Sequence, residues 1–129
     1  MGIEGKQYPR VTVEIDAGKV AEFAWAIGAD PNEGVPPTFA AVYCLGATAP
    51  QLFDDEEAAI DFARLLHAEQ EFEWTQHPEV GDELTSQARV ASDISRRGMR
   101  FVTFETETTT KGGEPVCKSR ALFVIRGTP

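Results

Sequence analysis

Three consecutive stretches in the second half of the chain decide the fold: MRFVTFETETTT (residues 99–110), KGGE (111–114) and VCKSRALFVIR (116–126). Threonine, valine and phenylalanine are concentrated in the two longer segments, and these side chains suit the pleated surface of a β-sheet. The Gly-Gly pair between the segments is a strong signal for a tight hairpin. In the last segment Cys117 and Phe123 fall on one face, whereas the lysine and the arginines fall on the other. We therefore predict two long antiparallel strands.

Two further strands precede this hairpin. Glutamate alternates with Gln, Phe and Trp over residues 69–74, and residues 83–94 place Leu84 and Val90 on one side. The sequence Arg-Arg-Gly at 96–98 is a tight turn, so the second half is predicted to be a four-strand meander. Its strands have about ten residues, more than the usual 5–6, and long twisted strands tend to wrap around an apolar filling.

The first half carries helical signals. Residues 11–15 alternate as a short strand, Asp16 stands where a helix N-cap belongs, and Val20 begins an apolar stripe with a period of about 3.6 residues. Gly28 is a suitable helix end. The run of turn formers that follows, residues 29–37, contains too much proline for regular structure.

The next two segments are less clear. Residues 38–45 are small and apolar, and their periodicity is compatible with either a buried strand or a short buried helix. A second helix is predicted over residues 54–66, because Asp54 and Glu57 have capping-box spacing and an acidic first turn suits the helix dipole. The apolar faces of these helices are the expected filling for the sheet.

The 129 residues suffice for a single domain, residues 1–129, with its own core. Acidic side chains outnumber basic ones by 21 to 12, a formal net charge of −9. We therefore expect no nucleic-acid partner and no anionic membrane partner, because both need clustered Lys and Arg. There is no apolar run of about 18 residues for a transmembrane helix, and the start lacks the apolar core of a secretory signal. A cytoplasmic location is expected.

The metal-binding residue types are sparse. Cys44 and Cys117 have no metal-type spacing and are expected to be reduced, packed thiols. His67 and His77 alone cannot supply the three or four ligands of a zinc site. We therefore expect neither a metal nor a cofactor.

Four short motifs carry a resemblance to a known family: FAWAIG (residues 23–28), PPTF (36–39), LLHAEQEF (65–72) and GDEL (81–84). Their order resembles the MaoC-like dehydratases of the hot-dog fold. More narrowly, the chain is similar to the fatty-acid-synthase-type N-terminal dehydratase domain, which includes accessory subunits of (3R)-hydroxyacyl-ACP dehydratases. The resemblance implies an α+β hot-dog fold, with an antiparallel sheet wrapped around a central helix, and a dimer with another hot-dog subunit.

One departure from the family motif bears on catalysis. Catalytic members carry Gly-Asp-x-Asn-Pro-x-His after the first helix, and the resemblance assigns its Asp and His to acid–base work on water addition to, or loss from, an acyl thioester. Residues 28–35 here read GADPNEGV. Aligned on Gly28, the histidine position is Gly34; aligned on Asp30, it is Val35. The missing histidine implies a non-catalytic half, which shapes the acyl channel and in which the central helix is often reduced.

The weak catalytic candidates are Asp30, His67 and Glu69. Each has an ordinary structural interpretation: an Asx turn before a proline, a histidine at a helix end, and one position on a solvated strand face. Phe39 and Tyr43 are candidates for lining an acyl tunnel, and both also suit a plain core.

Positive charge is densest around one turn. Arg96, Arg97 and Arg100 surround Gly98, and arginine forks fit the phosphate oxygens of CoA or of the phosphopantetheine of an acyl carrier protein. The alternative interpretation is a charged hairpin tip.

Three functions follow from these observations. The favoured one is a substrate-binding, non-catalytic subunit of an (R)-specific 2-enoyl-thioester hydratase or 3-hydroxyacyl-thioester dehydratase, which acts on acyl-CoA or acyl-ACP with a catalytic partner. The second is a self-sufficient hot-dog dehydratase or an acyl-CoA thioesterase. A thioesterase needs an acid on the central helix; residues 38–53 contain none, whereas Asp61 becomes a candidate if the helix spans 54–66. The third is a non-enzymatic module that binds an acyl ligand.

Overall fold

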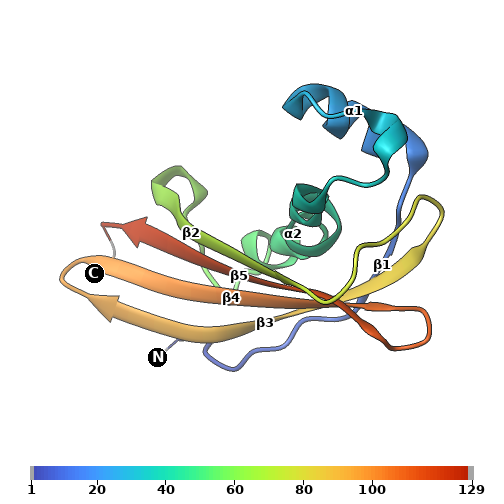
Figure 1. The fold of residues 1–129 in the computed structure, drawn as a ribbon. Coiled ribbons are helices and arrows are strands. Elements are labelled where there is room, and N and C mark those ends of the chain that lie inside the picture. Colours follow the sequence, from blue (N-terminus) through green and yellow to red (C-terminus); the bar gives the residue numbers. More distant parts are fainter. Residues whose placement is uncertain (1, 128–129) are drawn as a thin grey trace.

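A computed structural model describes residues 2–127, which form a curled antiparallel sheet around a central helical segment (Figure 1). The strand order is β1-β3-β4-β5-β2. The strands are β1 Val11–Glu14, β2 Leu65–Trp74, β3 Glu83–Arg96, β4 Met99–Thr110 and β5 Pro115–Arg126. The predicted strands are present, and the meander is confirmed for β3, β4 and β5. The prediction is wrong for β2, which lies beside β5 and not beside β3.

The helical elements all lie before β2 in the chain. They are α1 Ala17–Ile27, a 3-10 turn Pro31–Glu33, a second 3-10 turn Pro37–Phe39, a π-helical turn Ala41–Gly46, α2 Ala47–Phe53 and a third 3-10 turn Phe62–Arg64. The predicted ends of α1 are confirmed. Asp16 accepts a hydrogen bond from the backbone N–H of Lys19, and Gly28 closes the helix at φ 75°. The open question at residues 38–45 is answered in favour of helix.

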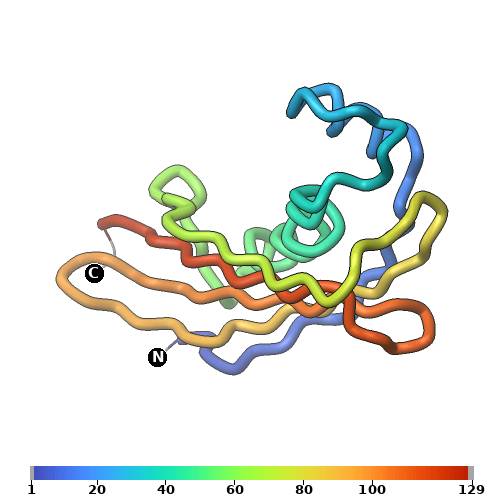
Figure 2. The backbone as a smooth tube through the Cα atoms, in the orientation of Figure 1, coloured from blue at the N-terminus to red at the C-terminus, as the bar shows by residue number. Residues whose placement is uncertain are grey.

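Residues 37–53 form the central helical segment, which lies over the concave face of the sheet (Figures 1 and 2). Its geometry is irregular, because it passes from 3-10 through π to α and contains Pro50. Hydroxyl groups satisfy carbonyls that this irregularity affects: Ser86 Oγ donates to the carbonyl of Tyr43 at 2.8 Å, and Thr48 Oγ1 donates to that of Cys44 at 3.0 Å. A buried serine of β3 and a buried threonine of the segment itself therefore support its irregular backbone.

The prediction of a helix over residues 54–66 is wrong. The central segment ends at Phe53, and irregular turns follow up to the short 3-10 turn at 62–64. Asp54, the predicted N-cap, instead ends α2. The carboxylate of Asp55 beside it binds the Tyr8 hydroxyl at 2.7 Å and Lys6 Nζ at 2.7 Å. Ala59 has φ 50°, which a right-handed helix does not allow. Long-range contacts thus override a local capping pattern.

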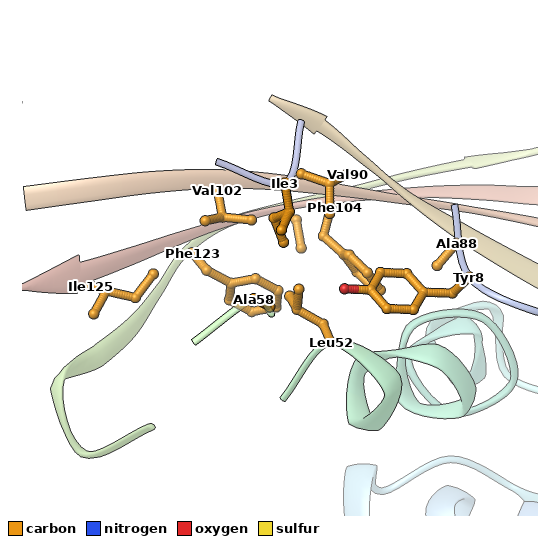
Figure 3. Packing of buried hydrophobic residues seen from close by; sticks show 11 residues of the cluster. Ile3, Tyr8, Leu52, Ala58, Ala88, Val90, Val102, Phe104, Phe123 and Ile125 are labelled. Atoms are coloured by element: carbon orange, nitrogen blue, oxygen red, sulfur yellow. The ribbon is translucent and has the colours of Figure 1, made fainter. Parts of the chain in front are cut away.

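Two clusters of buried side chains fill the space between the sheet and the central segment. The first joins Leu52 to Phe104 and Phe123 of the sheet and to Tyr8 (Figure 3). The second contains Ile15, Val20, Phe39, Ala40, Tyr43, Cys44, Leu84, Val116 and Cys117. Both cysteines are buried free thiols, as expected.

The segment before β1 completes the first cluster. It runs along β3, where Gly5 N–H donates to the carbonyl of Val90 at 2.8 Å and Tyr8 N–H donates to that of Ala88 at 2.9 Å. Ile3 and Tyr8 are each only 6% exposed. Residues 3–8 are therefore part of the folded core.

Candidate functional site

The loop after α1 occupies the position of the family's catalytic motif. Asp30 caps the short turn that follows it, and its Oδ1 accepts a hydrogen bond from the backbone N–H of Asn32 at 2.9 Å. This is the Asx turn that the sequence allowed. One oxygen of the exposed carboxylate thus binds the loop's own backbone.

The backbone of this loop does not accommodate the missing histidine. Gly34 has φ 96° and ψ −168°, a region that essentially only glycine adopts. The alternative position, Val35, is half-buried and packs against the second core cluster. Neither position therefore suits the side chain of the motif's histidine.

A surface hollow of about 730 Å³ lies between this loop and the turn from β2 to β3. Asn32, Glu33 and His77 are among its lining residues. Trp74 fixes the end of β2 against the same loop, because its indole Nε1–H donates to the carbonyl of Pro37 at 3.1 Å. No local pattern in the sequence joins His77 to the motif loop, because their proximity depends on how far β2 extends before it turns.

The other two acid–base candidates lie elsewhere. His67 stands near the start of β2, where its Nε2 lies 3.0 Å from Gln70 Oε1 and its ring lies 5.0 Å from that of Phe123. Trp74, at the other end of the strand, is seven positions further along, which is about 23 Å at the usual rise per residue. Glu69 is exposed and lies on the opposite face of β2 from His67, because the register shifts between them. Within residues 2–127 no hydrogen bond or ion pair joins Asp30 to either group.

Phe39 and Tyr43 belong to the packed core. Phe39 is 2% exposed and meets Phe23 edge-on at a centroid distance of 5.3 Å. Tyr43 is 1% exposed, and burial beside Cys117 and Cys44 raises the pKa of its phenol. In this structure both rings fill the space beneath the motif loop.

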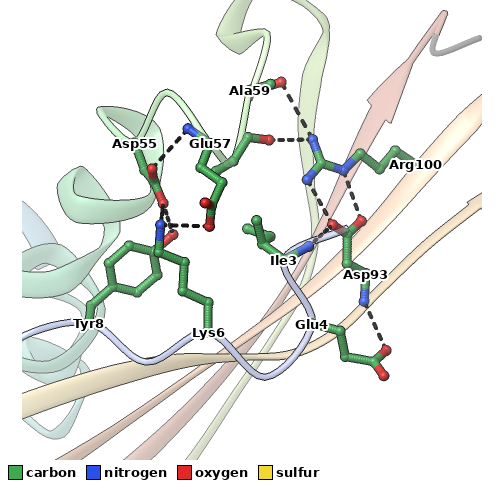
Figure 4. Close-up of polar contacts among 10 residues, drawn as sticks. Ile3, Glu4, Lys6, Tyr8, Asp55, Glu57, Ala59, Asp93 and Arg100 are labelled. Carbon is green, nitrogen blue, oxygen red and sulfur yellow. Dashed lines mark hydrogen bonds and ion pairs between the residues drawn. The ribbon is translucent and has the colours of Figure 1, made fainter. Parts of the chain in front are cut away.

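Arg100 is held inside a polar network (Figure 4). Its Nε and Nη2 bind the two carboxylate oxygens of Asp93 at 2.9 and 2.8 Å, and its Nη1 donates to the carbonyl of Ala58. The hydrogen bonds from Arg100 lower the pKa of the Asp93 carboxyl. Because Asp93 also accepts from the N–H of Ile3, Arg100 ties three segments together and is not free to bind a ligand.

Arg96 and Arg97 remain exposed at the tip of the β3–β4 hairpin. Arg97 has φ 51° and Gly98 has φ 76°, as a tight turn between twisted strands requires. Neither guanidinium forms an ion pair in the described part of the chain. Together with Ile94, Met99 and Phe101 they line a surface hollow of about 330 Å³, which combines apolar and cationic groups.

The curled sheet around a central helical segment is the hot-dog fold of the MaoC-like dehydratases. The chain belongs to the family described as FAS1-like, dehydratase domain region, which matches residues 3–119. A UPF0336 protein of Saccharopolyspora erythraea is 31% identical to it, over 96% of this chain and 89% of the relative.

Solved structures confirm the fold. A chain of the C-terminally truncated HadBC (3R-hydroxyacyl-ACP dehydratase) complex from Mycobacterium tuberculosis matches with a TM-score of 0.76, 20% identity, and coverage of 96% of this chain and 98% of that one. The (R)-hydratase from A. caviae involved in PHA biosynthesis matches with a TM-score of 0.65 at 20% identity, over 98% and 96% of the two chains. At such identity these likenesses concern the fold alone.

Among the helices of residues 2–127, none has the length and apolar character needed to cross a membrane. Over the same residues, no group of three or more His, Cys, Asp or Glu side chains is placed to hold a metal ion.

Proposed function

We propose that this chain is the substrate-binding, non-catalytic subunit of an (R)-specific 2-enoyl-thioester hydratase or 3-hydroxyacyl-thioester dehydratase. A second hot-dog subunit supplies the Asp and His that move protons to and from the substrate. The ligand is an acyl-CoA or acyl-ACP thioester.

One observation carries this proposal: the conformation of the motif loop. General acid–base catalysis needs a titratable group within hydrogen-bond reach of the proton that it moves. Gly34 offers no side chain and has a backbone that only glycine adopts, while Asp30 is bound to Asn32. The loop therefore keeps its place in the fold without carrying the motif's histidine.

The self-sufficient enzymes have less support. A thioesterase would need an acid on the central segment, and residues 37–53 contain neither Asp nor Glu. Asp61 is exposed, caps the turn at 62–64, and lies 3.4 Å from the guanidinium of Arg64. The non-enzymatic module remains the second candidate, because a loop without catalytic groups is equally suited to holding a ligand.

Hydration of crotonyl-CoA, followed by loss of the conjugated thioester absorbance, tests the proposal. We expect no turnover by the purified chain, and turnover when a hot-dog subunit with an intact Gly-Asp-x-Asn-Pro-x-His motif is added. That subunit alone must be less active than the mixture. Asp30→Asn is a matched control that keeps the Asx turn, so it should leave the mixture's activity unchanged.

The outcomes of this assay distinguish the candidate functions. Turnover by the lone chain would overturn the non-catalytic assignment. Binding of the thioester without a gain in turnover with any catalytic subunit would favour the non-enzymatic module.

A further inference from the structure

Strand β2 is an edge of the sheet and leaves one row of backbone groups unpaired. In the described chain it pairs only with β5, along nine register positions from Leu65 to Trp74. It contains no proline. Such an edge can accept another strand unless its side chains prevent this. The opposite edge, β1, has only four residues.

Charge alternates across the convex face of the sheet in rows that end at β2. In one row Glu71 of β2 lies opposite Arg120, Arg120 lies opposite Glu105, and Glu105 lies opposite Arg89. Arg89 and Glu105 form an ion pair. Each cross-strand neighbour in this row has the opposite charge, an arrangement that favours pairing.

A second row repeats the pattern two residues away. Glu73 lies opposite Lys118, and Lys118 lies opposite Glu107, with 3.5 Å between its Nζ and the Glu107 carboxylate. Both rows therefore reach the open edge with an acidic side chain. Continuing the alternation by one more strand requires a basic side chain opposite each glutamate.

A second copy of this chain does not meet that requirement. In an antiparallel pair, residues directly opposite each other point to the same face. Two-fold registers centred on Gln70, Glu71 or Phe72 each set glutamates of one copy against glutamates of the other, because Glu69, Glu71 and Glu73 are all exposed on one face. Like charges directly opposite are destabilising.

We propose that β2 selects a different subunit: the three glutamates oppose self-pairing and favour a hot-dog partner whose edge strand presents lysine or arginine on the same face. The inference rests on the proposed function only in taking the partner to be another hot-dog subunit. Under this proposal, charge complementarity at β2 makes the assembly a heterodimer.

The test uses two variants of β2 and light scattering coupled to gel filtration. Glu69→Gln/Glu71→Gln/Glu73→Gln removes the repulsion, and Glu69→Lys/Glu71→Lys/Glu73→Lys reverses the charge. We expect wild type to be monomeric at low salt and the Gln variant to self-associate about tenfold more tightly, which is about 1.4 kcal/mol. An equimolar mixture of wild type and the Lys variant should form a dimer that neither forms alone.

The matched control carries Glu22→Gln/Glu56→Gln/Glu114→Gln, three exposed glutamates away from β2 with the same change in net charge. It should associate as wild type does. Glu71→Lys and Glu73→Lys place like charges opposite Arg120 and Lys118, which could unfold the Lys variant. Thermal melts therefore establish that each variant is folded. If the Lys variant is unfolded, the Gln variant still tests the proposal.

Two results would overturn the proposal. One is a stable homodimer of wild type at low salt. The other is a folded Gln variant that gains no self-association, which would mean that the glutamates merely keep the edge solvated. Neither result depends on crotonyl-CoA turnover, so failure of this inference is distinguishable from failure of the proposed function.

Discussion

Two polar regions of this molecule differ in what holds them. Around Arg100, side-chain charges are paired and half-buried or deeper, and they join segments far apart in the sequence. In the loop of residues 28–37, by contrast, the conformation depends on backbone geometry at Gly28 and Gly34 and on an Asx turn. Arg100, one of the three arginines singled out in the sequence, is thus a structural tie. The loop on which the proposed function depends is instead marked by the absence of a histidine.

The prediction with the largest expected effect removes the ion pair between Arg100 and Asp93. Arg100→Ala leaves Asp93, whose side chain is 3% exposed, without its partner. Breaking a buried pair in this way typically costs about 3–5 kcal/mol. We expect a loss of that size in the free energy of unfolding, measured by urea denaturation. Arg96→Ala, at the exposed hairpin tip, should change it by less than about 0.5 kcal/mol.

A second test addresses Asp55, which binds the segment before β1 through Lys6 and Tyr8. Hydrogen bonds from Lys6 and Tyr8 lower the pKa of its carboxyl from 3.8 to about 2. The folded pKa lies below the unfolded one, so the stabilisation is complete above about pH 4 and is lost as pH falls through 2. At pH 7 Asp55→Asn should cost roughly 1.5–3 kcal/mol, as for hydrogen bonds to a charged group.

The pH series supplies the control for Asp55. The stability difference between wild type and Asp55→Asn should shrink between pH 4 and pH 2, measured by thermal melts. A difference that stays constant over this range would mean that the carboxylate's charge does not contribute.

The third test attempts to convert the loop into the catalytic motif. Gly34→His places a β-carbon where φ is 96°, which costs about 1–3 kcal/mol in strain. We expect lower stability and no crotonyl-CoA hydration by the lone chain. Gly34→Ala separates the two effects, because it carries the same strain without an imidazole. Hydration by Gly34→His would show that the loop needs only the side chain.

The smallest expected effect concerns the exposed arginines. Arg96→Ala/Arg97→Ala should weaken binding of acyl-CoA about tenfold at low salt, about 1.4 kcal/mol, and by less as salt screens the charges. Lys19→Ala/Lys111→Ala removes the same charge from other exposed positions and should leave affinity unchanged. Calorimetric titration measures both, and equal affinities for the two variants would reject docking at the hairpin tip.

Much of the sheet was predictable because its signals are local. β4 spans the predicted residues 99–110, since β-branched and aromatic side chains fill it and glycine-containing turns bound it. The N-cap at Asp16 and the left-handed end at Gly28 were predictable for the same reason. The pairing of β2 with β5 was not, because strand order depends on contacts between distant segments.

The errors share a cause. The acidic run at residues 54–57 looks like a helix start, but Lys6 and Tyr8 lie nearly fifty residues away and decide its structure. Proximity in the sequence groups Arg100 with Arg96 and Arg97. In the structure a shift of register between Val90 and Ser92 places Asp93 on the face where Arg100 binds it. The bulge leaves no mark in a pattern of alternating residues. At the motif loop the absence of histidine was visible in the sequence, whereas the conformation of Gly34 was not.

The segment along β3 has a consequence for the order in which the chain is assembled. Gly5 bonds to Val90, and Ile3 bonds to Asp93 across a separation of 90 residues. During synthesis these early residues have no partner until β3 has left the ribosome, and closing so long a loop is slow. Residues 3–8 are made well before β3 and are therefore among the last to be placed, and the first core cluster stays open on the Tyr8 side until β3 has been made.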